Sequence, residues 1–141
     1  MTDLSKYETL DSPVLKSIAD VRYRHVEHGP GYLCRGPAVD VGILRLRPGD
    51  STVNHYHEHL EESFLVLEGV VSMWIDGRKR AEFGPGDYYR SPPGEMHYFR
   101  NEDSGIWRAC FVKAPFDPQD THPVPWHPGA PVPRPAVGRA V

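Results

Sequence analysis

The feature that most constrains the fold is a series of short β-prone segments between residues 21 and 113. Val, Ile, Phe, Tyr and Trp are concentrated in these segments, and Gly and Pro separate one segment from the next. Because no helical pattern interrupts the series, it predicts an all-β sandwich or barrel. By this criterion strands are predicted at 39–47, 53–57, 62–68, 70–75, 79–83, 87–90, 96–100 and 106–113.

Turn-forming sequences support this prediction. Asp76-Gly77 lies between two of the predicted strands and is typical of a tight hairpin turn. The sequence Pro-Gly-Asp occurs at 48–50 and again at 85–87, where it predicts two further turns. Its repetition suggests that the barrel consists of two related halves.

Proline divides the chain into three parts. Eight of the 15 prolines lie between Pro115 and Pro135, and a residue without an amide donor is unsuited to a central strand. We therefore divide the chain into an N-terminal arm with the first strands (1–38), a barrel (39–113) and a proline-rich tail (114–141). The tail either remains solvated in a polyproline-like conformation or packs on the barrel or a second subunit.

Length and charge exclude several classes of protein. A chain of 141 residues with a net charge of -3 predicts one domain, and it argues against non-specific nucleic-acid binding. No apolar stretch approaches 18 residues, so we expect no membrane-spanning helix. The first six residues lack a secretory pattern, and two cysteines cannot form a disulfide framework. These features predict a cytoplasmic protein.

The first candidate site is the histidine-rich segment at 54–62. His55 and His57 would point to the same side of a strand, where two imidazoles form a ready pair of metal ligands. A carboxylate follows, but periodicity leaves its identity open. Strict alternation favours Glu61, whereas a turn after His57 would favour Glu62. The alternative interpretation is a solvated, histidine-rich surface loop, which would include His59.

The second candidate site follows a rigid turn. Pro92, Pro93 and Gly94 end one predicted strand, and His97 begins an aromatic strand just beyond them. A single histidine in such a place is more often structural than a metal ligand.

Taken together, the two segments resemble the conserved motifs of the cupin superfamily. The first is G-x5-H-x-H-x4-E-x6-G from Gly49 to Gly69, and the second is G-x5-P-x-G-x2-H-x3-N from Gly86 to Asn101. Every position of both motifs is filled, and the resemblance covers residues 40 to 113.

The resemblance implies both a fold and a metal site. The fold would be a double-stranded β-helix, or jelly-roll barrel, with a short N-terminal arm and the proline-rich tail. One divalent transition metal, Fe, Mn, Zn, Ni, Cu or Co, would be held by His55, His57, Glu62 and His97. The resemblance thus selects Glu62 over Glu61. An octahedral ion would keep two positions open for water, O2 or substrate oxygens.

Three functions are compatible with such a barrel. The first is an O2-dependent dioxygenase acting on a chelating substrate, and the second is a metal-dependent isomerase, epimerase or lyase acting on a sugar-like or acidic metabolite. The third is a non-catalytic module that binds a small ligand. No catalytic residue other than the metal ligands can be assigned from the sequence. The resemblance also suggests a homodimer.

Overall fold

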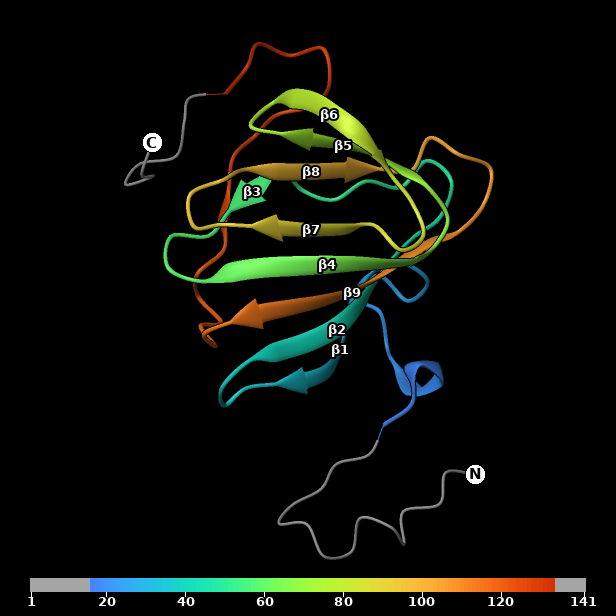
Figure 1. Ribbon diagram of the computed structural model, residues 1–141, viewed down its shortest axis with the longest axis vertical. Coiled ribbons are helices and arrows are strands. Elements are labelled where there is room, and N and C mark those ends of the chain that lie inside the picture. Colours follow the sequence, from blue (N-terminus) through green and yellow to red (C-terminus); the bar gives the residue numbers. More distant parts are fainter. Residues whose placement is uncertain (1–15, 134–141) are drawn as a thin grey trace, which may run out of the picture.

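Two five-stranded antiparallel sheets face each other in the computed structural model, which describes residues 16–133 (Figure 1). The first sheet has the order β1-β2-β9-β4-β7 and the second the order β10-β3-β8-β5-β6. The prediction of an all-β fold is confirmed. The strands are β1 (Gly29–Arg35), β2 (Asp40–Leu46), β3 (His55–Tyr56), β4 (Glu61–Glu68), β5 (Val71–Ile75), β6 (Arg78–Phe83), β7 (Tyr88–Ser91), β8 (His97–Arg100), β9 (Trp107–Ala114) and β10 (His122–Pro123).

Each of the eight strand predictions made from the sequence corresponds to a strand from β2 to β9. The structure also contains β1 and β10, which lie outside the eight predicted strand ranges. β1 has the sequence Gly-Pro-Gly-Tyr-Leu-Cys-Arg, whose glycines and proline are typical of a loop, yet it pairs with β2 along its length. β10 lies in the proline-rich tail. It is a two-residue strand at the sheet edge, the position where a missing amide donor is tolerated.

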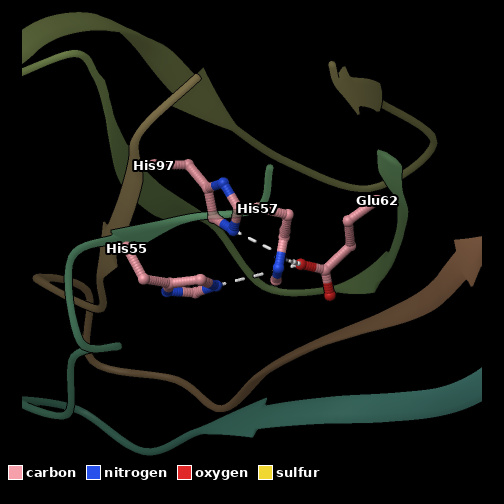
Figure 2. Close-up of side chains that lie close together, drawn as sticks. All are labelled: His55, His57, Glu62 and His97. Carbon is pink, nitrogen blue, oxygen red and sulfur yellow. Dashed lines mark hydrogen bonds and ion pairs between the residues drawn. The ribbon is translucent and has the colours of Figure 1, made fainter. Parts of the chain in front are cut away.

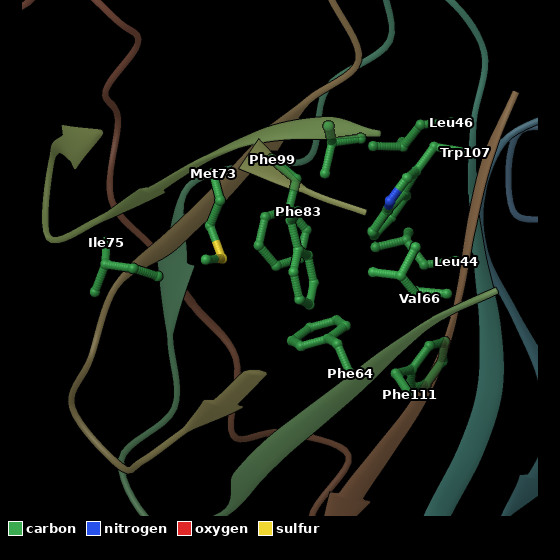
Figure 3. Packing of buried hydrophobic residues seen from close by; sticks show 12 residues of the cluster. Leu44, Leu46, Phe64, Val66, Met73, Ile75, Phe83, Phe99, Trp107 and Phe111 are labelled. Carbon is green, nitrogen blue, oxygen red and sulfur yellow. The ribbon is translucent and has the colours of Figure 1, made fainter. Parts of the chain in front are cut away.

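The hydrophobic core lies between the sheets (Figure 3). Alternate residues of β2, β4 and β9 point inward, which follows from the two-residue period of a strand. Phe99 and Trp107 are fully buried, and Phe64 packs edge-to-face on Phe99 with 5.0 Å between ring centres. Phe64 and Phe99 also lie 5.5 and 5.7 Å from the ring of His97, so the aromatic core continues beneath the histidine cluster.

The described part of the tail packs on the barrel. Val124 exchanges two hydrogen bonds with Asn54, one through its amide (2.9 Å) and one through its carbonyl (3.1 Å). Trp126 lies against Tyr98 and Trp74, with ring centres 5.6 and 6.5 Å away. Of the two alternatives for the tail, packing on the barrel therefore holds for residues 115–133. No helix among residues 16–133 is long and apolar enough to cross a membrane.

Candidate metal centre

Three strands bring four side chains together between the sheets (Figure 2). His55 lies on β3 and is the direct cross-strand partner of His97 on β8. His57 follows β3, and Glu62 reaches the same point from β4 in the opposite sheet. One nitrogen or oxygen atom from each of these side chains lies within 4.8 Å of the other three. The sequence-derived set is therefore a single cluster.

The distances within the cluster leave room for one small ion. Oε1 of Glu62 lies 3.0 Å from Nε2 of His57, 3.4 Å from Nε2 of His97 and 4.0 Å from Nε2 of His55. Metal bonds of about 2.1 Å place neighbouring octahedral ligands about 3.0 Å apart and opposite ligands about 4.2 Å apart. The observed distances fall in this range.

Each histidine is oriented by a contact on its other ring nitrogen. Nδ1 of His55 lies 2.7 Å from the carbonyl of Val53, and Nδ1 of His57 lies 2.5 Å from the carbonyl of Asp120. Nδ1 of His97 lies 3.0 Å from Oγ of Ser91. A carbonyl oxygen only accepts hydrogen bonds, so His55 and His57 donate from Nδ1. Their Nε2 lone pairs are then directed to the centre of the cluster, as in metal-binding histidines.

A bound cation would balance the hydrogen-bonding capacity of the cluster. Both nitrogens of His57 face oxygen acceptors, but a neutral imidazole has one N–H. Nε2 of His97 is fully buried and has no hydrogen-bond partner among the described residues. A divalent ion would satisfy both atoms, and three imidazoles with one carboxylate suit a transition metal. The donor set therefore fits one such ion.

Electrostatics keep these groups in the forms that bind metals. Burial raises the pKa of Glu62, but the interactions with the rings of His55, His57 and His97 outweigh burial and hold this pKa well below the usual range. Burial, together with the neighbouring His55, lowers the pKa of His97 to about 4. At neutral pH the cluster therefore contains an ionised carboxylate and a neutral His97.

Glu61 and His59, the other candidate residues of the histidine-rich segment, lie outside the cluster. Glu61 forms an ion pair with Arg90 on the exposed side of the sheet. His59 is 71% exposed and contacts Glu58. The Pro-Pro-Gly turn helps to position His57, because the amide of Gly94 donates a hydrogen bond to the carbonyl of His57 at 2.6 Å. Gly94 has a φ of 85°, a backbone conformation that favours glycine.

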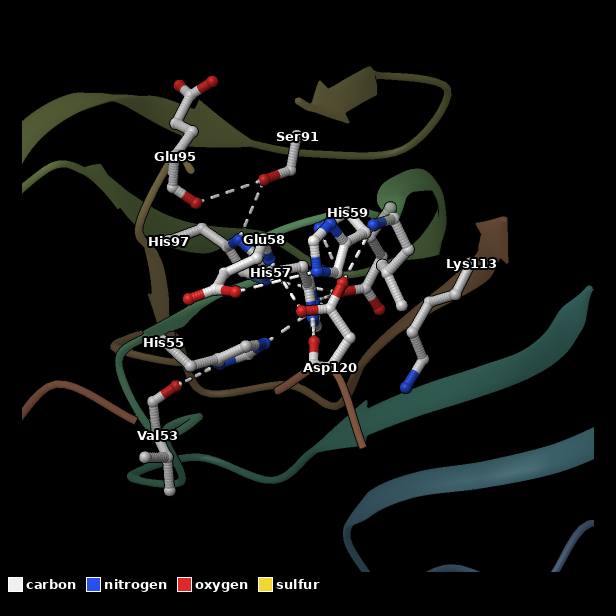
Figure 4. A network of polar contacts seen from close by, with 12 residues as sticks. Val53, His55, His57, Glu58, His59, Ser91, Glu95, His97, Lys113 and Asp120 are labelled. Atoms are coloured by element: carbon white, nitrogen blue, oxygen red, sulfur yellow. Dashed lines mark hydrogen bonds and ion pairs between the residues drawn. The ribbon is translucent and has the colours of Figure 1, made fainter. Parts of the chain in front are cut away.

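A residue of the tail organises the cluster and was missed by the sequence analysis (Figure 4). Oδ1 of Asp120 accepts from the amide of Glu58 (2.7 Å), and Oδ2 accepts from the amides of His59 (2.7 Å) and Leu60 (2.9 Å). Burial raises the pKa of Asp120, but these bonds and one from His122 outweigh it and lower the pKa to about 2. Asp120 thus holds the loop between His57 and Glu62.

The cluster lies at one end of a cavity of about 400 Å³. His55, Glu62 and His97 line this end, and aromatic rings including Phe64 and Phe111 line the walls. The lining also includes five charged side chains that were not among the sequence-predicted site residues: Arg24, Arg35, Asp40, Lys113 and Asp117. The site therefore combines a donor set that fits a metal ion with space for a small molecule.

The chain is similar in sequence to several known proteins over part of its length. The chain is 42% identical over 52 residues to quercetin 2,3-dioxygenase of Bacillus subtilis, a match that covers 37% of this chain and 15% of that protein. The matched segments cover between 15 and 51% of the curated relatives.

Two solved structures show the same fold. The polyketide cyclase RemF from Streptomyces resistomycificus superposes with a TM-score of 0.67 at 24% identity, over 82% of this chain and 87% of RemF. An uncharacterised protein with a double-stranded β-helix domain from Klebsiella pneumoniae gives a TM-score of 0.66 at 20% identity, over 74% of this chain and 92% of that chain. The predicted double-stranded β-helix is confirmed. The family model for the cupin domain matches residues 42–112, half of the chain, and the protein therefore belongs to the cupin family.

Proposed function

We propose that His55, His57, Glu62 and His97 hold one divalent transition-metal ion and that the protein is an enzyme acting on a small, metal-chelating molecule. The observation that carries this proposal is the convergence of three Nε2 atoms on one oxygen of Glu62 at the end of an open cavity. A site that served stability alone would be closed on all sides.

The residues around the cluster would prepare it for chemistry. Val53, Ser91 and Asp120 hold the three imidazoles in fixed orientations, so little rearrangement is needed on binding. Phe64 and Phe99 pack beneath His97 and exclude water from that side. A bound ion would supply a Lewis acid and, if it is redox-active, a partner for O2.

The reaction that we favour is O2-dependent dioxygenation of a chelating enol or diol. The local similarity to a quercetin dioxygenase supports this choice, together with the aromatic walls of the cavity. The test is oxygen uptake by protein loaded in turn with Fe(II), Mn(II), Ni(II) and Cu(II), with 3-hydroxyflavone as the probe. We expect uptake that matches flavonol loss and that disappears in Glu62→Gln. Flavonol that binds every metal form without oxygen uptake would contradict the proposal.

An isomerase, epimerase or lyase acting on a sugar-like or acidic metabolite is the second candidate. Arg24, Arg35 and Lys113 line the cavity and would suit a carboxylate or phosphate group. This function predicts exchange of a substrate carbon-bound proton with deuterium by the Zn(II) form, without oxygen uptake. If neither reaction occurs and probes only bind, the third function, a non-catalytic binding module, would replace both.

Three further sequence predictions remain proposals: a homodimer, a cytoplasmic location, and the division of the chain into arm, barrel and tail. Light scattering during size-exclusion chromatography tests the first, and a monomer would contradict it.

A further inference from the structure

A row of four charged side chains crosses the first sheet beside the metal cluster. The strand register pairs Arg35 with Asp40, Asp40 with Lys113, and Lys113 with Glu62. Direct cross-strand partners project from the same face of a sheet, and all four residues line the cavity. The row therefore places charges of alternating sign along the inner face, and Glu62 belongs to the metal cluster.

Asp40 is buried in this row, and one of its carboxylate oxygens has no hydrogen-bond partner among the described residues. Its side chain belongs to a residue that is 2% exposed, and its Oδ1 atom is buried without a hydrogen-bond partner among residues 16–133. Buried polar atoms are nearly always hydrogen-bonded, and a carboxylate oxygen needs a donor. Since Asp40 lines the cavity, a bound molecule can supply that donor.

The two neighbouring cations are held by aromatic rings instead. Nζ of Lys113 donates to the hydroxyl of Tyr32 at 3.0 Å and lies 5.2 Å from the centre of its ring. The guanidinium of Arg35 lies 4.3 Å from the centre of the same ring. Neither forms an ion pair with Asp40 in the described part of the chain. Both therefore lie in the row beside Asp40 without supplying the hydrogen bond that Oδ1 lacks.

A second row, of aromatic residues, lies next to the charged row, two residues farther along each of β2, β9 and β4. Tyr32 and Phe111 are both cross-strand partners of Gly42, and Phe111 is also paired with Phe64. A Cβ atom on Gly42 would lie 2.5 Å from the ring of Phe111, so the glycine leaves room for that ring. Tyr32 and Phe111 meet edge-to-face with 5.5 Å between ring centres, and Phe64 continues the row, so aromatic rings line the cavity beside the row of charged side chains.

We propose that Asp40 accepts a hydrogen bond from a hydroxyl group of the substrate, at the end remote from its metal-chelating oxygens. The substrate class is a polyhydroxylated aromatic or conjugated molecule, whose rings lie along Tyr32, Phe111 and Phe64. Asp40 and Glu62 are separated by two strand spacings, about 9.6 Å, which such a molecule can span. This inference rests on the proposed function, because it requires the other end of the molecule to chelate the metal.

The test compares chelators with and without a remote hydroxyl group. Protein loaded with Zn(II), which does not consume the probe, is titrated with 3-hydroxyflavone and with its 3,6-, 3,7- and 3,4′-dihydroxy counterparts. We expect at least one dihydroxyflavone to bind the wild type about tenfold more tightly than 3-hydroxyflavone, the effect of one hydrogen bond to a charged group. Asp40→Asn should reduce this preference several-fold and Asp40→Ala should abolish it, with bound zinc unchanged.

Asp117→Asn is the matched control, because Asp117 also lines the cavity and undergoes the same chemical change. It should retain the wild-type preference. Equal binding of all four flavones to the wild type, or a preference that survives Asp40→Ala, would overturn the role of Asp40 while the metal site stands. Failure of every flavone to bind the zinc form would instead overturn the proposed chelating-substrate function.

Discussion

Replacing Asp120 by asparagine tests whether the tail holds the metal-binding loop in place. The carboxylate accepts three backbone N–H groups and one bond from His122, two at each oxygen. An asparagine of the same shape has one acceptor oxygen, and its NH2 group would face donors in place of the other oxygen. The substitution therefore removes both the charge and part of the hydrogen bonding.

The expected loss of stability follows from the pKa of Asp120. A pKa of about 2 in the folded protein, against an ordinary value of 3.8, corresponds to about 2 kcal/mol. An unsatisfied buried N–H adds about 1 kcal/mol or more. We therefore expect Asp120→Asn to lower the free energy of unfolding in urea by about 3 kcal/mol at pH 7. The backbone carbonyl of residue 120 contacts Nδ1 of His57, so a shift of this segment should displace His57 and lower metal affinity about tenfold or more.

The control and the pH dependence make this prediction refutable. Asp103→Asn makes the same change at an exposed position and should alter stability by less than about 0.5 kcal/mol. A lowered carboxyl pKa stabilises above pH 3.8, and the stabilisation is lost as pH falls toward 2. The difference between wild type and Asp120→Asn should therefore shrink below pH 4. Equal stability of Asp120→Asn and Asp103→Asn at pH 7, with unchanged metal affinity, would refute the reasoning.

Two further predictions concern the support of the cluster and the core. Ser91→Ala removes the partner of Nδ1 of His97 and should weaken metal binding about tenfold while the circular dichroism spectrum stays unchanged; unaltered affinity in a calorimetric titration would contradict this. Phe99→Ala removes a fully buried ring and should lower the free energy of unfolding by about 3–5 kcal/mol, whereas a loss below about 1 kcal/mol in urea would show that the core is not packed as described.

The sequence predicted those parts of the site in which the ligands lie only a few residues apart in the chain. His55 and His57 lie two residues apart, and spacing alone indicated that they share a face. The choice between Glu61 and Glu62 needed the resemblance to a known motif, because a bend after His57 changes the alternation. The structure places Glu62 inside the cluster and Glu61 outside it, on Arg90.

Contacts between distant segments could not be predicted. The bond between His57 and Asp120 joins residues 63 positions apart, and nothing in a proline-rich segment indicates which strand it will follow. The alternation of charge along Arg35, Asp40 and Lys113 likewise depends on the pairing register of β1, β2 and β9. Local sequence patterns do not predict this register. The bounds of β1 were not predicted, although first strands were expected within residues 1–38, because its glycines and proline locally resemble a loop.

Metal content per chain tests the central claim most directly. Untagged wild-type protein and the variants His57→Ala, Glu62→Gln and Glu61→Gln are purified in parallel and analysed by inductively coupled plasma mass spectrometry, before and after titration with divalent ions. We predict close to one transition-metal ion per chain in the wild type and in Glu61→Gln, and a strong loss in His57→Ala and Glu62→Gln. A wild type that takes up no ion, or equal metal content in all four proteins, would contradict the claim that these residues form a metal site.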